Sequence, residues 1–254
     1  MAESQRLYGL QGVVTGAADG IGEAIARTLV KHGARVLAAD APGSGIESVF
    51  RRVRGISTLV IDLDAPTMAA KLTQESIDSL GGVDILVNNF MGRLESANHT
   101  DEDALRRRLE QVLQQIAETS TAIFRLLQQS PAGRIINIGC LRSAFGSQGS
   151  AALARTKQAL AALTASQAAE FGAFGINVNY IQPGAIMTTR SRTVFDADKD
   201  FRDRCIRQSA AKRLGEPLDV AKVALFLASG DSAFVSGTGI VVDGGAVPTD
   251  AVDE

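Results

Sequence analysis

Short runs of β-branched and other apolar residues alternate along the chain with amphipathic helical patterns. We expect strands at seven such runs, residues 12–15, 34–39, 58–63, 83–87, 134–138, 176–181 and 239–242. Strands that alternate with helices form a parallel sheet, because each crossover helix lies on one of its faces. The pattern therefore predicts the α/β fold class. We expect a doubly wound, Rossmann-type, seven-stranded parallel sheet with helices on both faces and ligands at the carboxyl ends of the strands.

Two long helices are expected in the middle of the chain. The segment 101–129 has apolar residues at steps of three, four and seven, namely Leu105, Leu109, Val112, Ile116, Ile123 and Leu127. This spacing predicts one amphipathic helix with a buried stripe, and Thr119, in the gap of the stripe, should face inward. The second helix, at about 147–170, is rich in alanine, and small side chains allow close packing against a sheet or another helix.

Composition favours one domain over residues 1–254, because a chain that is 45% hydrophobic can bury a large core. The net charge of -2 gives no basic excess, so we expect no nucleic acid and no membrane as partners. No apolar stretch reaches the roughly 18 to 20 residues of a spanning helix, and residues 1–8 are too short and polar for a signal peptide. We expect a cytoplasmic protein.

The sequence predicts no metal site. Cys140 and Cys205 have neither metal-ligand spacing nor the dense pattern of a disulfide scaffold. His32 precedes the glycine that ends the first helix, and His99 lies in a polar loop, so neither has the neighbours that a metal ion requires. We expect both cysteines to be reduced thiols.

The first predicted strand leads into a glycine turn and then a helix. The turn has the spacing Gly-x-x-x-Gly-x-Gly after Thr15, and its residues include Gly16, Asp19, Gly20, Ile21 and Gly22. Glycines let the chain turn tightly and bring backbone N–H groups against a pyrophosphate, and the helix dipole favours the anion. A glycine triplet alone is also found in ordinary turns, but the strand-turn-helix context favours a dinucleotide site.

Later motifs follow in the order of a known family. They include Asn88-Asn89 after the fourth strand, Lys157, Pro183-Gly184 with Thr188, and Val242-Asp243-Gly244-Gly245. With these motifs the chain resembles the short-chain dehydrogenase/reductase family over about residues 9–247. The resemblance implies a nicotinamide cofactor. The residues it implies at the cofactor are Thr15, Gly16, Asp19, Gly20, Ile21, Gly22, Asp40, Asp62, Asn89, Lys157, Pro183, Gly184 and Thr188.

The carboxylates favour NAD over NADP. Asp40 ends the second strand, where it can accept hydrogen bonds from the adenosine ribose and repel a 2′-phosphate, and Asp19 should repel it again. The alternative for Asp40 is a solvated turn carboxylate. Phe90 and Met91 stand where the family has alanine and glycine, so we expect them to weaken or abolish cofactor binding.

The catalytic positions depart from the family pattern. The resemblance places the family's tyrosine at Leu153, its lysine at Lys157, its serine at Cys140 and its asparagine at Thr119, so only Lys157 matches. An alkyl side chain at position 153 cannot transfer a proton. Tyr180 is either a substitute donor or a packed strand aromatic, and Cys140 is either a nucleophile or a small buried residue.

Three functions remain open. The first is a degenerate, non-catalytic subunit of an NAD-dependent oxidoreductase, acting on a hydroxyl or carbonyl of a small molecule or acyl thioester. A paralogous partner would then carry the chemistry in a heterotetramer, since closed oligomers allow one subunit to be replaced by a paralogue. The second is a homotetrameric enzyme with altered chemistry, such as a lyase, an isomerase or an unconventional dehydrogenase, in which a desolvated Lys157 is base or nucleophile. The third is an NAD-binding sensor.

The substrate is not specified by the sequence. We expect the lid over the cleft at about residues 188–212. Arginines near the expected cleft either clamp an anionic group of a ligand or are solvated surface residues. They are Arg142, Arg155, Arg190 and Arg192.

Overall fold

The structure is a computed structural model and describes residues 5–90, 102–139 and 150–246. A 7-stranded parallel sheet with the order β3-β2-β1-β4-β5-β6-β7 runs through it. The strands are β1 (Gln11–Thr15), β2 (Arg35–Asp40), β3 (Ile56–Val60), β4 (Ile85–Asn88), β5 (Arg134–Ile138), β6 (Asn177–Pro183) and β7 (Gly239–Val242). The strand order reverses beside β1, which is where doubly wound sheets bind ligands.

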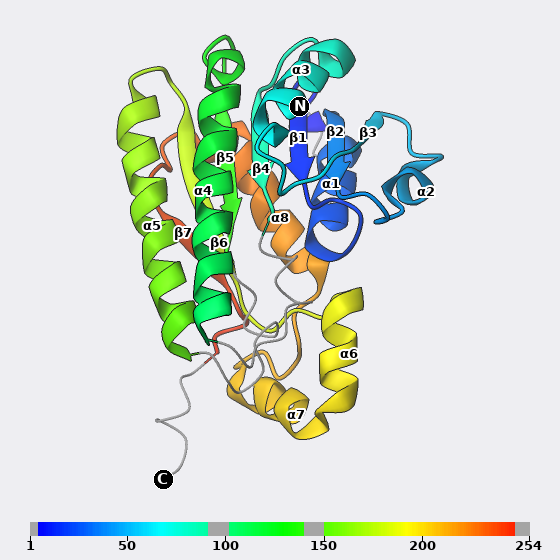
Figure 1. Cartoon of the computed structure of the whole chain (residues 1–254), viewed down its shortest axis with the longest axis vertical. Coiled ribbons are helices and arrows are strands. Elements are labelled where there is room, and N and C mark those ends of the chain that lie inside the picture. The colour runs from blue at the N-terminus through cyan, green and yellow to red at the C-terminus, as the bar shows by residue number, and fades with distance from the viewer. Residues whose placement is uncertain (1–4, 91–101, 140–149, 247–254) are drawn as a thin grey trace.

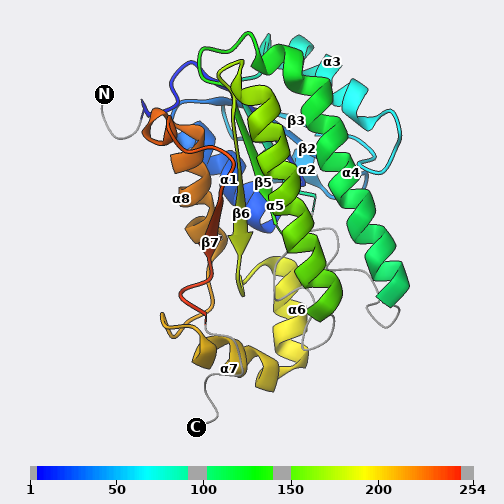
Figure 2. The ribbon, with the colours of Figure 1, turned by 90° about the vertical axis from the view of Figure 1, so that its left-hand side faces the viewer.

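Helices cover both faces of the sheet, as the sequence predicts. They are α1 (Gly20–Lys31), α2 (Ile46–Phe50), α3 (Met68–Leu80), α4 (Glu102–Leu127), α5 (Ser150–Gly172), α6 (Thr189–Ala197), α7 (Lys199–Gln208) and α8 (Pro217–Ala228), with a short 3-10 helix, η4 (Gly230–Ser232). Helices α3, α4 and α5 lie on one face, and α1 and α8 pack together on the other (Figures 1 and 2). The predicted fold class is therefore confirmed.

The strand predictions agree with the structure within two residues except at the third strand. The sequence predicts residues 58–63, whereas β3 is Ile56–Val60. Ile61 and Leu63 are buried, but they lie beyond the edge strand, where Leu63 O accepts a hydrogen bond from Gln115 Nε2 of α4 at 2.8 Å. Apolar residues can be buried under a helix without pairing in the sheet, and periodicity does not separate these two cases.

The buried stripe of the long central helix is confirmed. All six predicted residues of the stripe are buried in α4, and Thr119 is fully buried in its gap. Helix α4 packs between α3 and α5, so two of its neighbours and the sheet together cover this stripe. The burial explains why apolar residues recur at steps of three and four over the whole helix.

Helices α6 and α7 lie at the carboxyl ends of the strands, in the segment where the sequence predicts the lid, and this segment is called the lid below (Figure 1). They have a small core of their own, formed by Phe195, Phe201 and Cys205. The two rings are stacked with centroids 5.8 Å apart. Within the described ranges, no helix is long and apolar enough to span a bilayer, and no group of His, Cys, Asp and Glu side chains is arranged to hold a metal ion.

Candidate cofactor and catalytic site

The glycine turn between β1 and α1 is packed so closely that it requires glycine. Gly16 has a φ of 59°, which L side chains rarely adopt. A Cβ at Gly16 would lie 2.2 Å from Asn89 O, and a Cβ at Gly22 would lie 2.0 Å from Gly16 O. The close packing of the turn against the start of α1 and the end of β4 therefore leaves no room for a side chain at Gly16 or Gly22.

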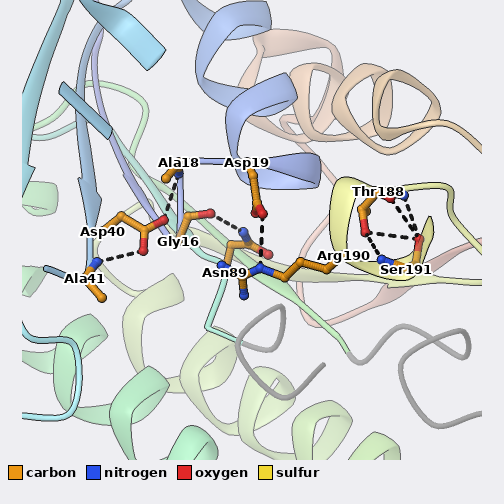
Figure 3. A network of polar contacts seen from close by, with 9 residues as sticks. All are labelled: Gly16, Ala18, Asp19, Asp40, Ala41, Asn89, Thr188, Arg190 and Ser191. Atoms are coloured by element: carbon orange, nitrogen blue, oxygen red, sulfur yellow. Dashed lines mark hydrogen bonds and ion pairs between the residues drawn. The ribbon is translucent and has the colours of Figure 1, made fainter. Parts of the chain in front are cut away.

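Asn89 and Thr15 hold this turn against the end of β4. The Thr15 hydroxyl donates to Val87 O at 3.3 Å and accepts from Asn89 N at 3.0 Å. The side-chain amide of Asn89 donates to Gly16 O at 2.8 Å (Figure 3). All three residues are buried, so these bonds fix the two neighbouring strand ends relative to each other.

Asp40 lies at the end of β2 and is buried, with 3% of its surface exposed. Its Oδ2 accepts from Ala18 N at 2.8 Å and its Oδ1 accepts from Ala41 N at 2.7 Å (Figure 3). A solvated turn carboxylate would have neither this burial nor these partners. Each carboxylate oxygen can accept a second hydrogen bond, so Asp40 can still bind ribose hydroxyls while it orders the turn.

The N-terminus of α1 has no side-chain cap. Asp19 is the N-cap residue, but its carboxylate makes no hydrogen bond to the first turn of the helix. Its Oδ2 instead accepts from Arg190 Nε of the lid at 3.0 Å (Figure 3). The first-turn N–H groups, which have no acceptor within a helix, thus remain without a side-chain acceptor and suit an anion such as a pyrophosphate.

Ile21 contributes to this turn through its backbone, because its side chain is buried in the core. Asp62 lies after β3, is exposed, and accepts a hydrogen bond from Asp64 N at 2.9 Å. Phe90 is 1% exposed and packs in the main core. Met91, the other bulky residue at this strand end, lies outside the described residues.

The lid begins beside the glycine turn. Thr188 caps α6 through a reciprocal pair of bonds with Ser191, in which Thr188 N donates to Ser191 Oγ at 2.7 Å and Ser191 N donates to Thr188 Oγ1 at 3.0 Å. A Cβ at Gly20 would lie 3.1 Å from Thr188 Cγ2, so the first residue of α1 lies close to the N-cap residue of α6. The structure thus brings the two predicted ends of the cofactor site together.

Pro183 and Gly184 end β6 beside β7. Pro183 pairs with Val242, and Gly184 N donates to Val242 O at 2.9 Å. A Cβ at Gly184 would lie 2.4 Å from Asp243 Cβ, so this position also requires glycine. The packing of β6 against β7 therefore explains the glycine of this motif without any contact with a ligand.

The catalytic positions are only partly described. Leu153 and Lys157 both lie in α5, one helical turn apart, whereas Cys140 lies outside the described residues. Lys157 is half-buried, and its ammonium group makes no hydrogen bond or ion pair to any other residue that the structure describes. The Thr119 hydroxyl donates to Gln115 O of its own helix at 2.7 Å and contacts Met68 Sδ at 4.0 Å. The hydroxyl is thus occupied within α4 and with α3.

Tyr180 packs within the sheet. In the register of β6 and β7 it lies opposite Gly239, and a Cβ at Gly239 would lie 2.0 Å from Tyr180 Cζ. The ring therefore covers the glycine of the edge strand. Pro183, where the predicted nicotinamide motif begins, lies three residues further along the strand, about 10 Å from Tyr180. The ordinary interpretation, a packed strand aromatic, agrees with this geometry.

A buried polar network that the sequence analysis did not identify joins the helices to the sheet. Asn88 Nδ2 donates to Ser120 Oγ at 3.1 Å and to Asn137 Oδ1 at 2.9 Å, and Asn137 Nδ2 donates to Thr164 Oγ1 at 3.2 Å. These bonds connect β4 and β5 to the helices that carry Thr119 and Lys157. The sequence signal for this network is the presence of asparagines within otherwise apolar strands, because a buried side-chain amide requires hydrogen-bond partners.

Comparisons with known proteins agree with this architecture. Residues 16–247 match a family model described as enoyl-(acyl carrier protein) reductase. The 3-oxoacyl-(acyl-carrier-protein) reductase FabG of Vibrio cholerae is 33% identical over 248 residues, covering 94% of this chain and 98% of that protein. The FabG of Escherichia coli K12 is 32% identical over 243 residues, covering 92% of this chain and 95% of that protein.

A solved structure is similar over the whole fold. The crystal structure of a hydroxysteroid dehydrogenase from Escherichia coli has a TM-score of 0.83 and 29% sequence identity. The similarity covers 96% of this chain and 98% of that one. That solved structure therefore shares the overall fold of this chain.

Proposed function

Since the chain belongs to the short-chain dehydrogenase/reductase family of oxidoreductases, we propose that it is an NAD-binding subunit that does not itself transfer protons. In this proposal a paralogous member of the family carries the chemistry within a mixed tetramer. The complex oxidises or reduces a hydroxyl or carbonyl group of a small molecule or an acyl thioester. The names of the relatives, an acyl-carrier-protein reductase and a hydroxysteroid dehydrogenase, support both substrate classes.

The observation that carries the proposal is Leu153 in α5, one helical turn before Lys157. The family's proton donor is expected at this position, and an alkyl side chain cannot exchange a proton. The loss of a general acid or base removes about 10²- to 10⁴-fold in rate. Two further observations support it, because the Thr119 hydroxyl is bonded within its own helix and the Tyr180 ring packs on Gly239.

The cofactor part of the site fits a dinucleotide. Asp40 would hold the adenosine ribose, the first turn of α1 would hold the pyrophosphate, and the segment from Pro183 to Thr188 would hold the nicotinamide end. Bound NAD supplies hydride transfer. The chain's own residues bind and orient it, and Asp40 disfavours a 2′-phosphate because its carboxylate is buried at the ribose position.

An altered chemistry at Lys157 is the alternative. Lys157 is half-buried, and its ammonium group has no acceptor among the residues that the structure describes, so no described carboxylate neutralises it. In that case the chain would be a homotetrameric lyase, isomerase or unconventional dehydrogenase, with Lys157 as base or Schiff-base nucleophile. This function needs no partner chain.

Coexpression of the chain with its genomic neighbours, followed by native mass spectrometry, tests the proposal. We expect a mixed tetramer with a second chain of similar mass, and NAD-linked turnover only in that complex. Turnover should be abolished when the partner's catalytic tyrosine is replaced by phenylalanine. Sustained turnover by the homogeneous chain, abolished by Lys157→Ala, would establish the alternative instead. If the chain binds NADH but no assembly shows turnover, the NAD-binding sensor is the function that remains.

A further inference from the structure

An ion pair connects the lid to the glycine turn across the expected cofactor site. Arg190 is the second residue of α6, and its Nε lies 3.0 Å from Asp19 Oδ2. The two residues are 171 positions apart in the sequence, and each side chain is 35% exposed. Figure 3 shows the arginine side chain extending from the Thr188 side toward Asp19, with Asp40 beyond it on the other side.

This pair changes the charge at the start of α1. Asp19 alone would place a carboxylate beside the first turn, where it would repel an anionic ligand. Arg190 compensates that charge. A guanidinium also has five N–H donors in a planar fork that matches phosphate oxygens, so it can bind a phosphate while its Nε remains bonded to a carboxylate.

The pair is not needed to position the lid. The Thr188–Ser191 cap, the contact of Thr188 with Gly20 and the small core around Phe195 already fix the start of α6. An ion pair whose members are about a third exposed adds little to stability, because water and salt screen it. Its position between the ribose carboxylate and the nicotinamide motif instead suits a ligand that extends between them.

Resting on the NAD proposal, we propose that Arg190 binds the pyrophosphate of the dinucleotide and that Asp19 positions its guanidinium. The lid thereby contributes a cation to a phosphate site that otherwise consists of backbone N–H groups. The role of Asp19 also changes, since it orients an arginine and does not repel the cofactor. Discrimination against a 2′-phosphate then depends on Asp40 alone.

Calorimetric titration with ADP-ribose, which contains the pyrophosphate but no nicotinamide, tests this role. We expect Arg190→Ala to weaken ADP-ribose binding by about 10- to 100-fold, the usual effect of losing a charge-assisted hydrogen bond. Affinity for adenosine, measured by ligand-observed NMR, should be unchanged within about twofold, because adenosine lacks the pyrophosphate that Arg190 would bind. Arg192→Ala is the matched control, because Arg192 lies on the same helix and is exposed.

A double variant separates ligand binding from lid structure. In Arg190→Ala the Asp19 carboxylate loses its partner and repels the pyrophosphate, so Asp19→Ala/Arg190→Ala should recover several-fold of the lost affinity. Thermal unfolding of each variant establishes that it is folded.

Three results would overturn the inference. Equal ADP-ribose affinities for Arg190→Ala and Arg192→Ala would show that Arg190 does not contact the pyrophosphate. An equal loss for adenosine and ADP-ribose would show a general effect on the lid. If the wild-type chain binds neither NADH nor ADP-ribose, the NAD proposal fails together with this inference, whereas normal wild-type binding with no effect of Arg190→Ala refutes this inference alone.

Discussion

Replacement of Asp40 by alanine should destabilise the fold as well as weaken dinucleotide binding. The substitution leaves the buried Ala18 N–H without its acceptor, and an unsatisfied buried donor costs about 1–3 kcal/mol. Ala41 N–H loses its acceptor too, but that residue is half-buried and water can replace the carboxylate. We therefore expect a loss of about 1–3 kcal/mol. For a chain of this length that loss lowers the Tm by about 2–12 °C.

Differential scanning calorimetry of Asp40→Ala beside Asp62→Ala checks this magnitude. Asp62 also follows a strand, but its carboxylate is exposed and accepts one hydrogen bond from Asp64 N, so its loss should cost less than about 1 kcal/mol. Equal Tm values for the two variants would refute the reasoning. They would show that the Asp40 bonds do not order the turn, and that any loss of NADH affinity in Asp40→Ala reflects the ribose contact alone.

The purified chain should bind NADH more tightly than NADPH by at least about tenfold, which fluorescence titration measures, and an NADP preference would contradict the Asp40 argument. Leu153→Tyr alone should not create alcohol oxidation, because catalytic groups that act as a unit are strongly non-additive. Activity should require the further changes Thr119→Asn, Cys140→Ser, Phe90→Ala and Met91→Gly, and turnover by the single variant would show that only the phenol is missing. Arg213 holds the pKa of the Asp219 carboxyl below its ordinary value by hydrogen bonding. The stabilisation by this pair should be complete above about pH 4, the usual range of an unfolded aspartate, and should disappear as pH falls through the lower folded value. The Tm difference between wild type and Arg213→Ala should therefore be measurable at pH 6 and should shrink as the pH falls below the usual range of an aspartate.

Much of the fold could be predicted because its elements bury whole faces. The stripe from Leu105 to Leu127 is set by the geometry of one helix, and the strands are apolar because helices cover the sheet on both sides. The error at β3 arises at an edge, where Ile61 and Leu63 are buried by a helix and not by strand pairing.

The candidate site could be predicted only where its contacts are local. The glycine turn and the carboxylate of Asp40 follow from their positions next to strands, and the structure brings them together through the bond from Ala18 N. The pairing of Arg190 with Asp19 depends on how the lid is oriented, which no periodicity specifies. The gap in the apolar stripe predicts that Thr119 faces inward, and its burial confirms this, but the contact of its hydroxyl with Met68 depends on how the neighbouring α3 packs.

The small core of the lid has a consequence for folding and for divergence within the family. Because the cluster of Phe195, Phe201 and Cys205 is separate from the main core, α6 and α7 can open or unfold as a local unit while the sheet stays native. Their amide protons should exchange together and earlier than those of the central strands. A segment of this kind can also be exchanged between relatives as a block, so that a new ligand preference is acquired without repacking the domain that supports it.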